Sequence, residues 1–283
     1  MKTLAYYNGK ISEQKDMLIP MNDRASWFGD GVYDAGPARN YKIFAIDEHV
    51  DRFFRNATWL DIEMPLAKDE FKKLLNELLS KMDSGDQFVY MQVTRGTGIR
   101  DHLYTVGPGN LWVTMKPVTY PDDKISHKVI LREDDRWMHN NIKCINLIPA
   151  VRHSEAAKRA GCIEAILVRP SGIVTECAHS NVHIMKNGRV ITHPTDNLIL
   201  PGIARAHMVR MCATLGIPIE ERPFTVDELL AADEIMISSS SKFLMRIGEI
   251  DGNPVGENDP DTYFKLRNAL FKEFYDSTEK MGS

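Results

Sequence analysis

The sequence predicts an α+β fold with two domains. Its 283 residues suit one large domain or two modest ones, since a domain averages about 150 residues. Hydrophobic residues alternate with strand periodicity in some stretches and recur with helical periodicity in others, in both halves of the chain. A stretch over 118–124 carries prolines and aspartates and is typical of a linker. We therefore expect a small α/β domain over 1–118, a linker over 119–125 and a larger domain over 126–283.

The composition excludes several classes of protein. With 43% hydrophobic and 26% charged residues, the chain is an ordinary globular protein. Its net charge of −4 gives no basic surface for nucleic acid. No apolar run approaches the roughly 20 residues of a spanning helix, and Asn8-Gly9 interrupts any signal peptide. The four cysteines form no CxxC pair. We expect a cytoplasmic protein without a disulfide framework or a metal site.

The first half is expected to contain two hairpins, two helices and two further strands. Asn8-Gly9 and Asn40-Tyr41 separate the paired strands, and Asn-Gly is typical of a type I′ turn. Asp47 is a suitable N-cap for the first helix. The expected elements are strands Leu4–Tyr7, Lys10–Ile11, Gly31–Arg39 and Lys42–Ile46, helices from Asp47 to Leu60 and Asp69–Met82, and strands Gln87–Thr94 and Leu111–Met115.

The second half carries clear start and stop signals. Pro149 and Gly161 delimit one helix, Gly216 ends another, and Thr225 with Glu228 forms a capping box. Ser171-Gly172 and Asn187-Gly188 indicate turns between short strands over 164–192. The other expected elements are strands Val129–Leu131, Ile142–Ile148, Ile235–Ile237 and Arg246–Ile250, and helices Ile203–Leu215 and Leu266–Tyr275.

Lys143 lies in an apolar extended run, and the acidic residues nearest to it in sequence are Asp135, eight positions before it, and Glu155, twelve positions after it. Apolar surroundings remove water from an ammonium group and make it easier to deprotonate to a nucleophilic amine. A lysine whose stem packs while its head reaches water gives the same pattern.

Two other features could bind an anion. Leu200-Pro201-Gly202 leads into a predicted helix start, where free N–H groups favour phosphate. Ser238–Ser241 follows a predicted strand, and its hydroxyls could bind phosphate. Each has a simpler interpretation, as a helix cap and as a polar turn. Ser241 with Lys242 could also form the nucleophile and base of a hydrolase.

Taken together, these features fit the cofactor pyridoxal 5′-phosphate. That cofactor needs a nucleophilic lysine, a phosphate site and a carboxylate facing its pyridine nitrogen. Glu176, between two predicted strands, is a candidate for the carboxylate.

The sequence resembles the fold-type IV pyridoxal-phosphate aminotransferases, and within them the D-amino acid-specific group. The resemblance covers nearly the whole chain, because the matching segments keep the order and spacing of the family. These segments are FGDGVY (28–33), EHVDR (48–52), RGTGIRDH (95–102), IKCINL (142–147), TECAHSNV (175–182), LILPGIAR (198–205) and the serine run 238–241. It implies a larger, β-barrel-like domain with helices that binds the cofactor.

The resemblance implies roles for individual residues. Lys143 matches the lysine that forms the Schiff base with the cofactor and moves the substrate proton, and Glu176 matches the carboxylate at the pyridine nitrogen. Arg52 matches the arginine paired with the phosphate, although as a helix residue it could equally be solvated. The other matching cofactor contacts are Leu200, Ile203, Ala204, Ser239, Ser240 and, in the segment TECAHSNV, Asn181.

The substrate site is implied by Tyr33, Arg100 and His102, which match the residues that bind the substrate carboxylate in the D-specific group. A guanidinium offers fixed paired donors to a carboxylate; taken alone, Arg-Asp-His in a loop is also ordinary surface polarity. In the family the Arg-x-His pair comes from the neighbouring subunit, so the resemblance implies a homodimer.

Several positions depart from the family pattern. Asp34 replaces a glutamate and shortens the reach of its carboxylate, and Ala35-Gly36-Pro37 replaces larger residues, with a proline that cannot donate to a sheet. Ala204 replaces a threonine, and His179 replaces a small polar residue.

The resemblance implies ping-pong transamination of a D-amino acid such as D-alanine with a 2-oxo acid such as 2-oxoglutarate. The cofactor would alternate between pyridoxal and pyridoxamine 5′-phosphate. A branched-chain L-aminotransferase, an (R)-amine transaminase and aminodeoxychorismate lyase share the fold, and a non-enzymatic carrier of the cofactor is a further alternative. Arg100 and His102 argue against the first two.

Overall fold

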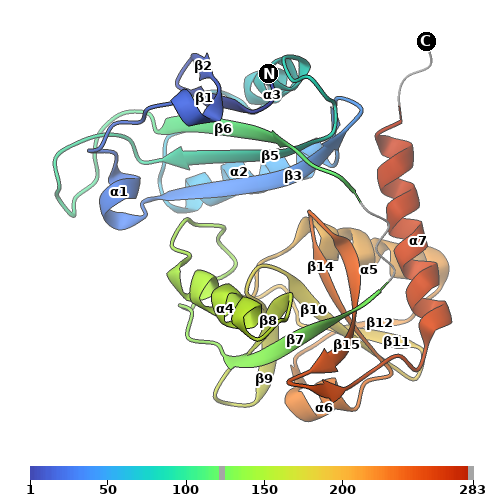
Figure 1. Ribbon diagram of the computed structural model, residues 1–283. Coiled ribbons are helices and arrows are strands. Elements are labelled where there is room, and N and C mark those ends of the chain that lie inside the picture. The colour runs from blue at the N-terminus through green and yellow to red at the C-terminus, as the bar shows by residue number, and fades with distance from the viewer. Residues whose placement is uncertain (121–124, 280–283) are drawn as a thin grey trace. The chain divides into compact units, whose positions relative to one another are not determined.

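The computed structural model describes residues 1–120 and 125–279, which form two compact units (Figure 1). Unit 1 consists of Met1–Tyr120, Ile142–Asn146 and the residues from Phe274 onward. Unit 2 consists of residues within Pro121–Asn141 and of Leu147–Glu273. The linker expected over 119–125 includes residues 121–124, which lie outside the described residues. Unit 1 is therefore discontinuous in sequence, and its short middle piece contains Lys143.

Unit 1 contains a six-stranded antiparallel sheet in the order β2-β1-β6-β5-β3-β4. Both predicted hairpins are confirmed. Asn8 and Gly9 have φ of 43° and 92°, and Asn40 and Tyr41 have φ of 52° and 61°, as the two central residues of a type I′ turn require. The strands are β1 (Leu4–Tyr7), β2 (Lys10–Ser12), β3 (Gly31–Arg39), β4 (Lys42–Ile43), β5 (Gln87–Thr94) and β6 (Asn110–Pro117).

Two long helices, α2 (Ile46–Trp59) and α3 (Lys68–Ser80), bury one face each in the core of this unit. The expected N-cap at Asp47 is wrong. The N-cap is Ala45, which has a left-handed φ of 50°, and Asp47 lies in the first turn. A negative charge there still stabilises the helix through its dipole. The short helix α1 (Arg24–Phe28) and the 3-10 turn Gln14–Asp16 have no counterpart in the sequence prediction.

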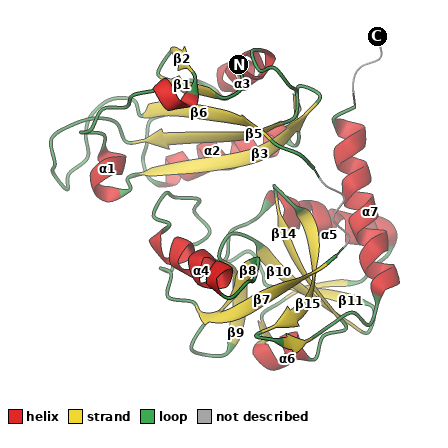
Figure 2. Ribbon diagram, in the orientation of Figure 1, coloured by secondary structure: helices red, strands yellow, loops and turns green. Residues whose placement is uncertain are grey.

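Unit 2 is built on a ten-stranded sheet in the order β12-β11-β10-β14-β15-β7-β8-β9-β13, with β16 beside β15. Because β9 also contacts β10, the sheet curls, as the expected barrel-like domain requires (Figure 2). The strands are β7 (Ser126–Glu133), β8 (Glu164–Val168), β9 (Ile173–Cys177), β10 (Asn181–Lys186), β11 (Arg189–Thr192), β12 (Ile219–Glu221), β13 (Phe224–Thr225), β14 (Glu234–Ser239), β15 (Phe243–Ile250) and β16 (Asn253–Pro254).

The helix signals of the second half are confirmed. Gly216, with φ of 69°, ends its helix, and Thr225 and Glu228 cap each other's backbone N–H at 3.3 and 3.0 Å. The helices are α4 (Ile148–Arg159), α5 (Ile203–Leu215), α6 (Val226–Leu230) and α7 (Pro260–Ser277). No helix among the described residues is both long and apolar enough to cross a membrane.

The strand expected over Ile142–Ile148 is wrong. This segment forms a single β-bridge, between Cys144 and Val32, and α4 already begins at Ile148. The backbone turns tightly at the lysine, because the Cys144 N–H donates to the carbonyl of Ile142 at 2.9 Å.

Candidate active site

Lys143 is held between two residues that are buried in the core of unit 1. Ile142 and Cys144 are 7% and 5% exposed and belong to the same hydrophobic cluster as Val32. The Tyr33 N–H donates to the Lys143 carbonyl at 2.9 Å, and the Ile145 N–H donates to the Gly31 carbonyl at 3.1 Å. The start of β3 therefore fixes the backbone on both sides of the lysine.

The side chain of Lys143 lies over the ring of Tyr33, with Nζ 4.4 Å from the ring centroid. Tyr33 in turn stacks on Tyr90, with ring centroids 5.5 Å apart. Among the described residues no carboxylate pairs with the Lys143 ammonium. The structure thus brings together two of the predicted site residues, an amine without an acidic partner and an aromatic face beneath it.

The unusual Asp34–Pro37 stretch remains an intact part of β3. The Phe44 N–H donates to the Pro37 carbonyl at 2.9 Å, so the polar backbone atoms of Pro37 face away from β5. The amide hydrogen that proline lacks therefore removes no bond from the β3–β5 ladder. Successive strand residues point to opposite faces, so Asp34 projects away from the Tyr33 side.

Arg52 lies in a buried polar cluster with Asp34 and His49 rather than on a solvated face of α2. Its Nε and Nη2 donate to the two oxygens of Asp34 at 2.7 and 2.9 Å, and His49 Nδ1 lies 2.7 Å from Asp34 Oδ1. Gly36 makes room for the His49 ring, because a Cβ at Gly36 would lie 2.8 Å from His49 Nε2. Asp34, although shorter than the glutamate of the family pattern, therefore still reaches Arg52, and Gly36 leaves room for the His49 ring.

This cluster keeps Asp34 charged. Burial alone would raise the pKa of its carboxyl, but the Arg52 charge and the contacts from His49 and Arg52 together bring that pKa below its usual value. A fixed negative charge orients the Arg52 guanidinium, whose planar fork matches a carboxylate in two positions.

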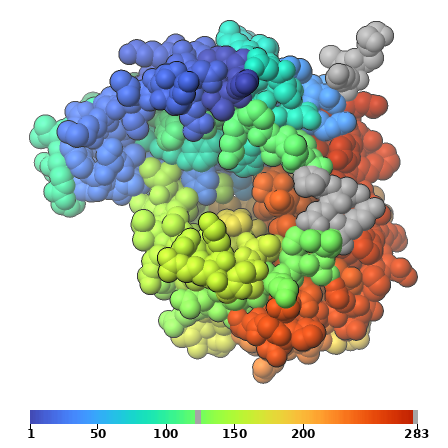
Figure 3. Space-filling model, in the orientation of Figure 1, coloured from blue at the N-terminus to red at the C-terminus, as the bar shows by residue number. Residues whose placement is uncertain are grey.

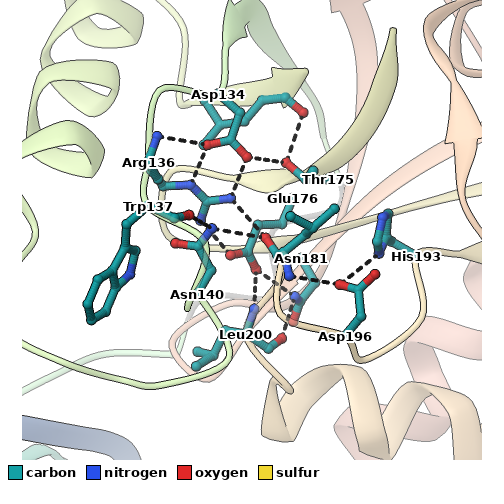
Figure 4. A network of polar contacts seen from close by, with 12 residues as sticks. Asp134, Arg136, Trp137, Asn140, Thr175, Glu176, Asn181, His193, Asp196 and Leu200 are labelled. Atoms are coloured by element: carbon teal, nitrogen blue, oxygen red, sulfur yellow. Dashed lines mark hydrogen bonds and ion pairs between the residues drawn. The ribbon is translucent and has the colours of Figure 1, made fainter. Parts of the chain in front are cut away.

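Glu176 lies within β9, one residue before its end, rather than between two strands. It is 5% exposed, and three donors surround it: Arg136 Nη1 at 2.5 Å, Asn181 Nδ2 at 2.9 Å and the Leu200 N–H at 3.1 Å (Figure 4). The Asn181 amide also donates to the Leu200 carbonyl at 2.9 Å. Three residues that were separate in the sequence prediction thus form one network in unit 2.

Arg136, which the sequence did not predict as part of the site, is the cation of this network. Its Nε and Nη2 donate to Asp134 at 2.9 and 3.0 Å, while Nη1 reaches Glu176. Asp134 also accepts from Thr175 at 2.8 Å (Figure 4) and pairs with Arg169 at 3.2 Å. The only sequence signal was a group of charges after a predicted strand, which is also typical of a solvated loop.

Burial raises the pKa of Glu176 above its usual value, and the Arg136 charge and the Leu200 N–H act against this rise. Burial would raise the pKa of Asp134 as well, yet Arg136, Thr175 and Arg169 lower it below its usual value. Arg136 is therefore the cation that both buried carboxyl groups share, and it opposes the rise that burial causes in the pKa of each.

The start of α5 is open to an anion. Gly202 is its N-cap and supplies no side-chain cap, so the N–H groups of the first turn, including those of Ile203 and Ala204, lack helical partners. A Cβ at Gly202 would collide with the side-chain oxygen of Asn181. This helix start consequently lies directly beside the Glu176 network.

Ser239 and Ser240 lie in the same part of unit 2. They follow Ser238, which pairs with Asn181 across β14 and β10, and α5 packs on β14. The hydroxyl of Ser239 is 3.4 Å from that of Ser241. Ser241 and Lys242 are exposed, and none of the described hydrogen bonds joins them.

Arg100 and His102 lie in unit 1, on the loop 95–109 between β5 and β6, and both are exposed. Both flank the ring of Phe28: the Arg100 guanidinium carbon is 5.4 Å from its centroid and the His102 ring 5.3 Å. No described contact joins either residue to Tyr33 of the same chain.

His179, one of the departures from the family pattern, is 62% exposed and lies 2.7 Å from the buried Glu164. It therefore belongs to a polar contact with the first residue of β8.

Comparisons with known proteins show the family of this chain. The family model described as amino-transferase class IV matches residues 31–250. The D-alanine aminotransferase of Bacillus licheniformis is 34% identical over 96% of this chain and 98% of its own. That of Listeria monocytogenes serotype 1/2a (strain 10403S) is 36% identical over 91% of this chain and 90% of its own. The structure of the T.th. branched-chain amino acid aminotransferase with pyridoxamine 5′-phosphate has a TM-score of 0.86 at 22% identity, covering 97% and 94% of the two chains.

Proposed function

The chain belongs to the amino-transferase class IV family, and we propose that within it the protein transaminates D-amino acids such as D-alanine with a 2-oxo acid such as 2-oxoglutarate. The observation that carries this proposal is the 34% identity to a D-alanine aminotransferase over 96% of the chain, and the segment RGTGIRDH, with Arg100 and His102, supports it through its resemblance to the D-specific group. The enzyme is an aminotransferase, and its substrates are small amino and 2-oxo acids.

The cofactor is pyridoxal 5′-phosphate, and the residues of this chain fit it. An unpaired amine at Lys143, a buried carboxylate at Glu176 and an uncapped helix start at Gly202 are the three groups that it requires. We assign the phosphate to the N–H groups of Ile203 and Ala204, the hydroxyls of Ser239 and Ser240, and Arg52. When bound, the cofactor supplies an electron sink for the charge that develops at the substrate Cα.

Lys143 is the nucleophile and the proton carrier. Its Nζ lies over the ring of Tyr33 and has no acidic partner among the described residues, so with the cofactor bound this amine would be the group that attaches to it and that moves the proton at the substrate Cα. The anchored backbone at Ile142 and Cys144 keeps the amine in one place through these steps.

With the cofactor bound, Glu176 would face the pyridine nitrogen and favour its protonated form, and Leu200 would contact the cofactor ring. The Glu176 carboxylate can stabilise that proton only while it is itself ionised, and the positive charge of Arg136 favours the ionised form. Asn181 and the Leu200 N–H fix the other carboxylate oxygen and so set the direction in which Glu176 faces.

The substrate carboxylate is bound by Tyr33, Arg100 and His102. We propose a homodimer in which Arg100 and His102 serve the partner's site, which is consistent with their exposure and with the lack of a described contact to Tyr33 in their own chain. We also propose a cytoplasmic location, where the four cysteine thiols would stay reduced.

The test is the absorption spectrum of the purified, cofactor-loaded protein before and after addition of D-alanine, with L-alanine and L-leucine as matched controls. We expect the visible band of the lysine-bound cofactor to disappear with D-alanine only. A response to L-leucine alone would move the enzyme to the branched-chain group.

Two further outcomes separate the remaining alternatives. A coloured protein that ignores all three amino acids and releases pyruvate from aminodeoxychorismate without an amino acceptor would be a lyase, and one that converts only (R)-amines would be an amine transaminase. A protein that binds the cofactor but transfers no amino group would be a carrier. Failure to take up the cofactor at all would refute the proposal.

A further inference from the structure

Two buried arginines anchor the loop 95–109, which carries Arg100 and His102, to the interior of unit 1. Arg24, on α1, is 3% exposed, and Arg95, at the start of the loop, is 5% exposed. Both donate through Nε to the same oxygen of Asp30, at 2.8 and 2.9 Å. The loop itself lies at the surface, in teal, beside the blue segment that contains α1 (Figure 3).

Arg24 binds the backbone on both sides of His102. Its Nη1 donates to the carbonyl of Asp101 at 2.7 Å and to the carbonyl of Leu103 at 3.0 Å. Its guanidinium carbon also lies 4.8 Å from the centroid of Phe28, the ring that Arg100 and His102 flank. A planar guanidinium with several fixed donors can make these contacts together, and a lysine cannot.

Arg95 fixes the base of the same loop. Its Nη groups donate to the carbonyls of Asp61 and Leu60 at 3.1 and 2.6 Å, and its guanidinium carbon lies 3.5 Å from the centroid of the Tyr104 ring. Asp30 thereby links the loop to the end of α2 through Arg95 and to α1 through Arg24. The side chains that face the substrate are exposed, but the backbone that carries them is tied to the interior.

We propose that Arg24, oriented by Asp30 and Arg95, is a positioning residue that holds Arg100 and His102 in the geometry needed to bind the substrate carboxylate. The proposal rests on the proposed function of Arg100 and His102. Arg24 touches neither substrate nor cofactor; it acts through the backbone of residues 101 and 103. Loss of these bonds should therefore weaken carboxylate binding and leave the chemistry at Lys143 intact.

The experiment compares the cofactor-loaded wild type with Arg24→Met, Arg24→Lys and a control, Arg39→Met. Arg39 ends β3 in the same sheet, and its guanidinium carbon lies over the ring of Tyr275, 4.6 Å from the centroid, far along the strand from Asp30. Two quantities are measured: amide hydrogen exchange of peptides that cover residues 96–109, and the dissociation constant of propionate, an unreactive carboxylate, by spectral titration. The KM and kcat for D-alanine are recorded alongside.

For Arg24→Met we expect faster exchange in this loop and a dissociation constant for propionate that is raised about tenfold or more, the effect of losing charge-assisted hydrogen bonds. The KM for D-alanine should rise similarly, and kcat should change less than about threefold. Arg24→Lys keeps the charge but loses the planar guanidinium, so its exchange rates and its dissociation constant should lie between those of the wild type and Arg24→Met. It also provides a second variant in case Arg24→Met does not fold. Arg39→Met should behave as wild type.

Unchanged exchange, or faster exchange with unchanged propionate binding, would overturn the proposal, and so would a similar effect of Arg39→Met. Failure of the proposed function shows itself differently. In that case the wild type does not respond to D-alanine and Arg100→Ala does not weaken propionate binding, whereas failure of the present inference leaves both of those results intact.

Discussion

Replacing Arg136 with methionine should destabilise the protein in a way that depends on pH. The side chain is the only described partner of Glu176 that carries a positive charge, and it also pairs with Asp134. Both carboxylates are almost fully buried, at 5% and 3% exposure. Removing one partner of a buried ion pair typically costs about 3–5 kcal/mol, because it leaves the other charge without compensation. We expect a loss of that size in the free energy of unfolding at pH 8.

The loss should shrink as the pH falls. Burial already raises the pKa of Glu176, and without Arg136 that pKa rises further above its value in the unfolded chain. The folded variant then binds more protons than the unfolded one, so its stability falls as pH rises, by at most about 1.4 kcal/mol per pH unit for one group. At pH 5 the variant should therefore recover a large part of its deficit relative to wild type.

The assay is urea unfolding at pH 5 and pH 8, with two companion variants. Arg136→Lys keeps the charge and loses the fork that joins both carboxylates, and we expect an intermediate loss. The double variant Arg136→Met with Glu176→Gln removes the uncompensated charge and should be more stable than Arg136→Met alone at pH 8. Equal destabilisation at the two pH values, or no relief in the double variant, would refute the reasoning.

Three other substitutions test the site directly. Lys143→Ala should lower kcat by more than about a thousandfold. Lys10→Ala, at an exposed position of β2, is the control and should keep the wild-type kcat. Near-normal turnover of Lys143→Ala would show that Lys143 is not the catalytic amine. Gly202→Ala should weaken cofactor binding about tenfold or more, since its methyl group displaces Asn181 at the start of α5. Gly188→Ala, whose methyl group meets nothing within 4 Å but whose left-handed φ of 70° strains an alanine, controls for strain alone and should leave that affinity unchanged in the same spectral titration. Arg100→Ala should raise the KM for D-alanine about tenfold or more, and an unchanged KM in steady-state kinetics would contradict the assignment of the carboxylate site.

Local rules predicted those parts of the fold that are decided locally. The Asn8-Gly9 turn, the Thr225 cap and the Gly216 helix end each depend on a few neighbouring residues, and all three were expected. The Ile142–Ile148 strand failed, because a strand needs a partner along its length and this segment meets β3 only around Cys144. Apolar sequence showed that the segment is buried but not what it pairs with.

The site divides in the same way. The family motifs predict Glu176, Arg100 and His102 as site residues, but the groups that hold these residues come from elsewhere in the chain. Arg136 lies 40 residues from Glu176 in sequence, and Arg24 lies 77 residues from the Asp101 carbonyl that it binds. Each is a charged residue near a turn, which in sequence is indistinguishable from a solvated one. Only the fold shows that they are buried and paired.

The discontinuity of unit 1 has a consequence for how the protein is made on the ribosome. Residues 1–120 emerge first, yet unit 1 also includes Ile142–Asn146 and the chain from Phe274 onward. Domains usually fold as units, with the N-terminal one first, as they leave the ribosome. Here unit 1 cannot complete its contacts until the residues from Phe274 onward have been translated, whereas every residue of unit 2 precedes Phe274. A truncation near the C-terminus should therefore leave the earliest part of the nascent chain exposed to chaperones and proteases.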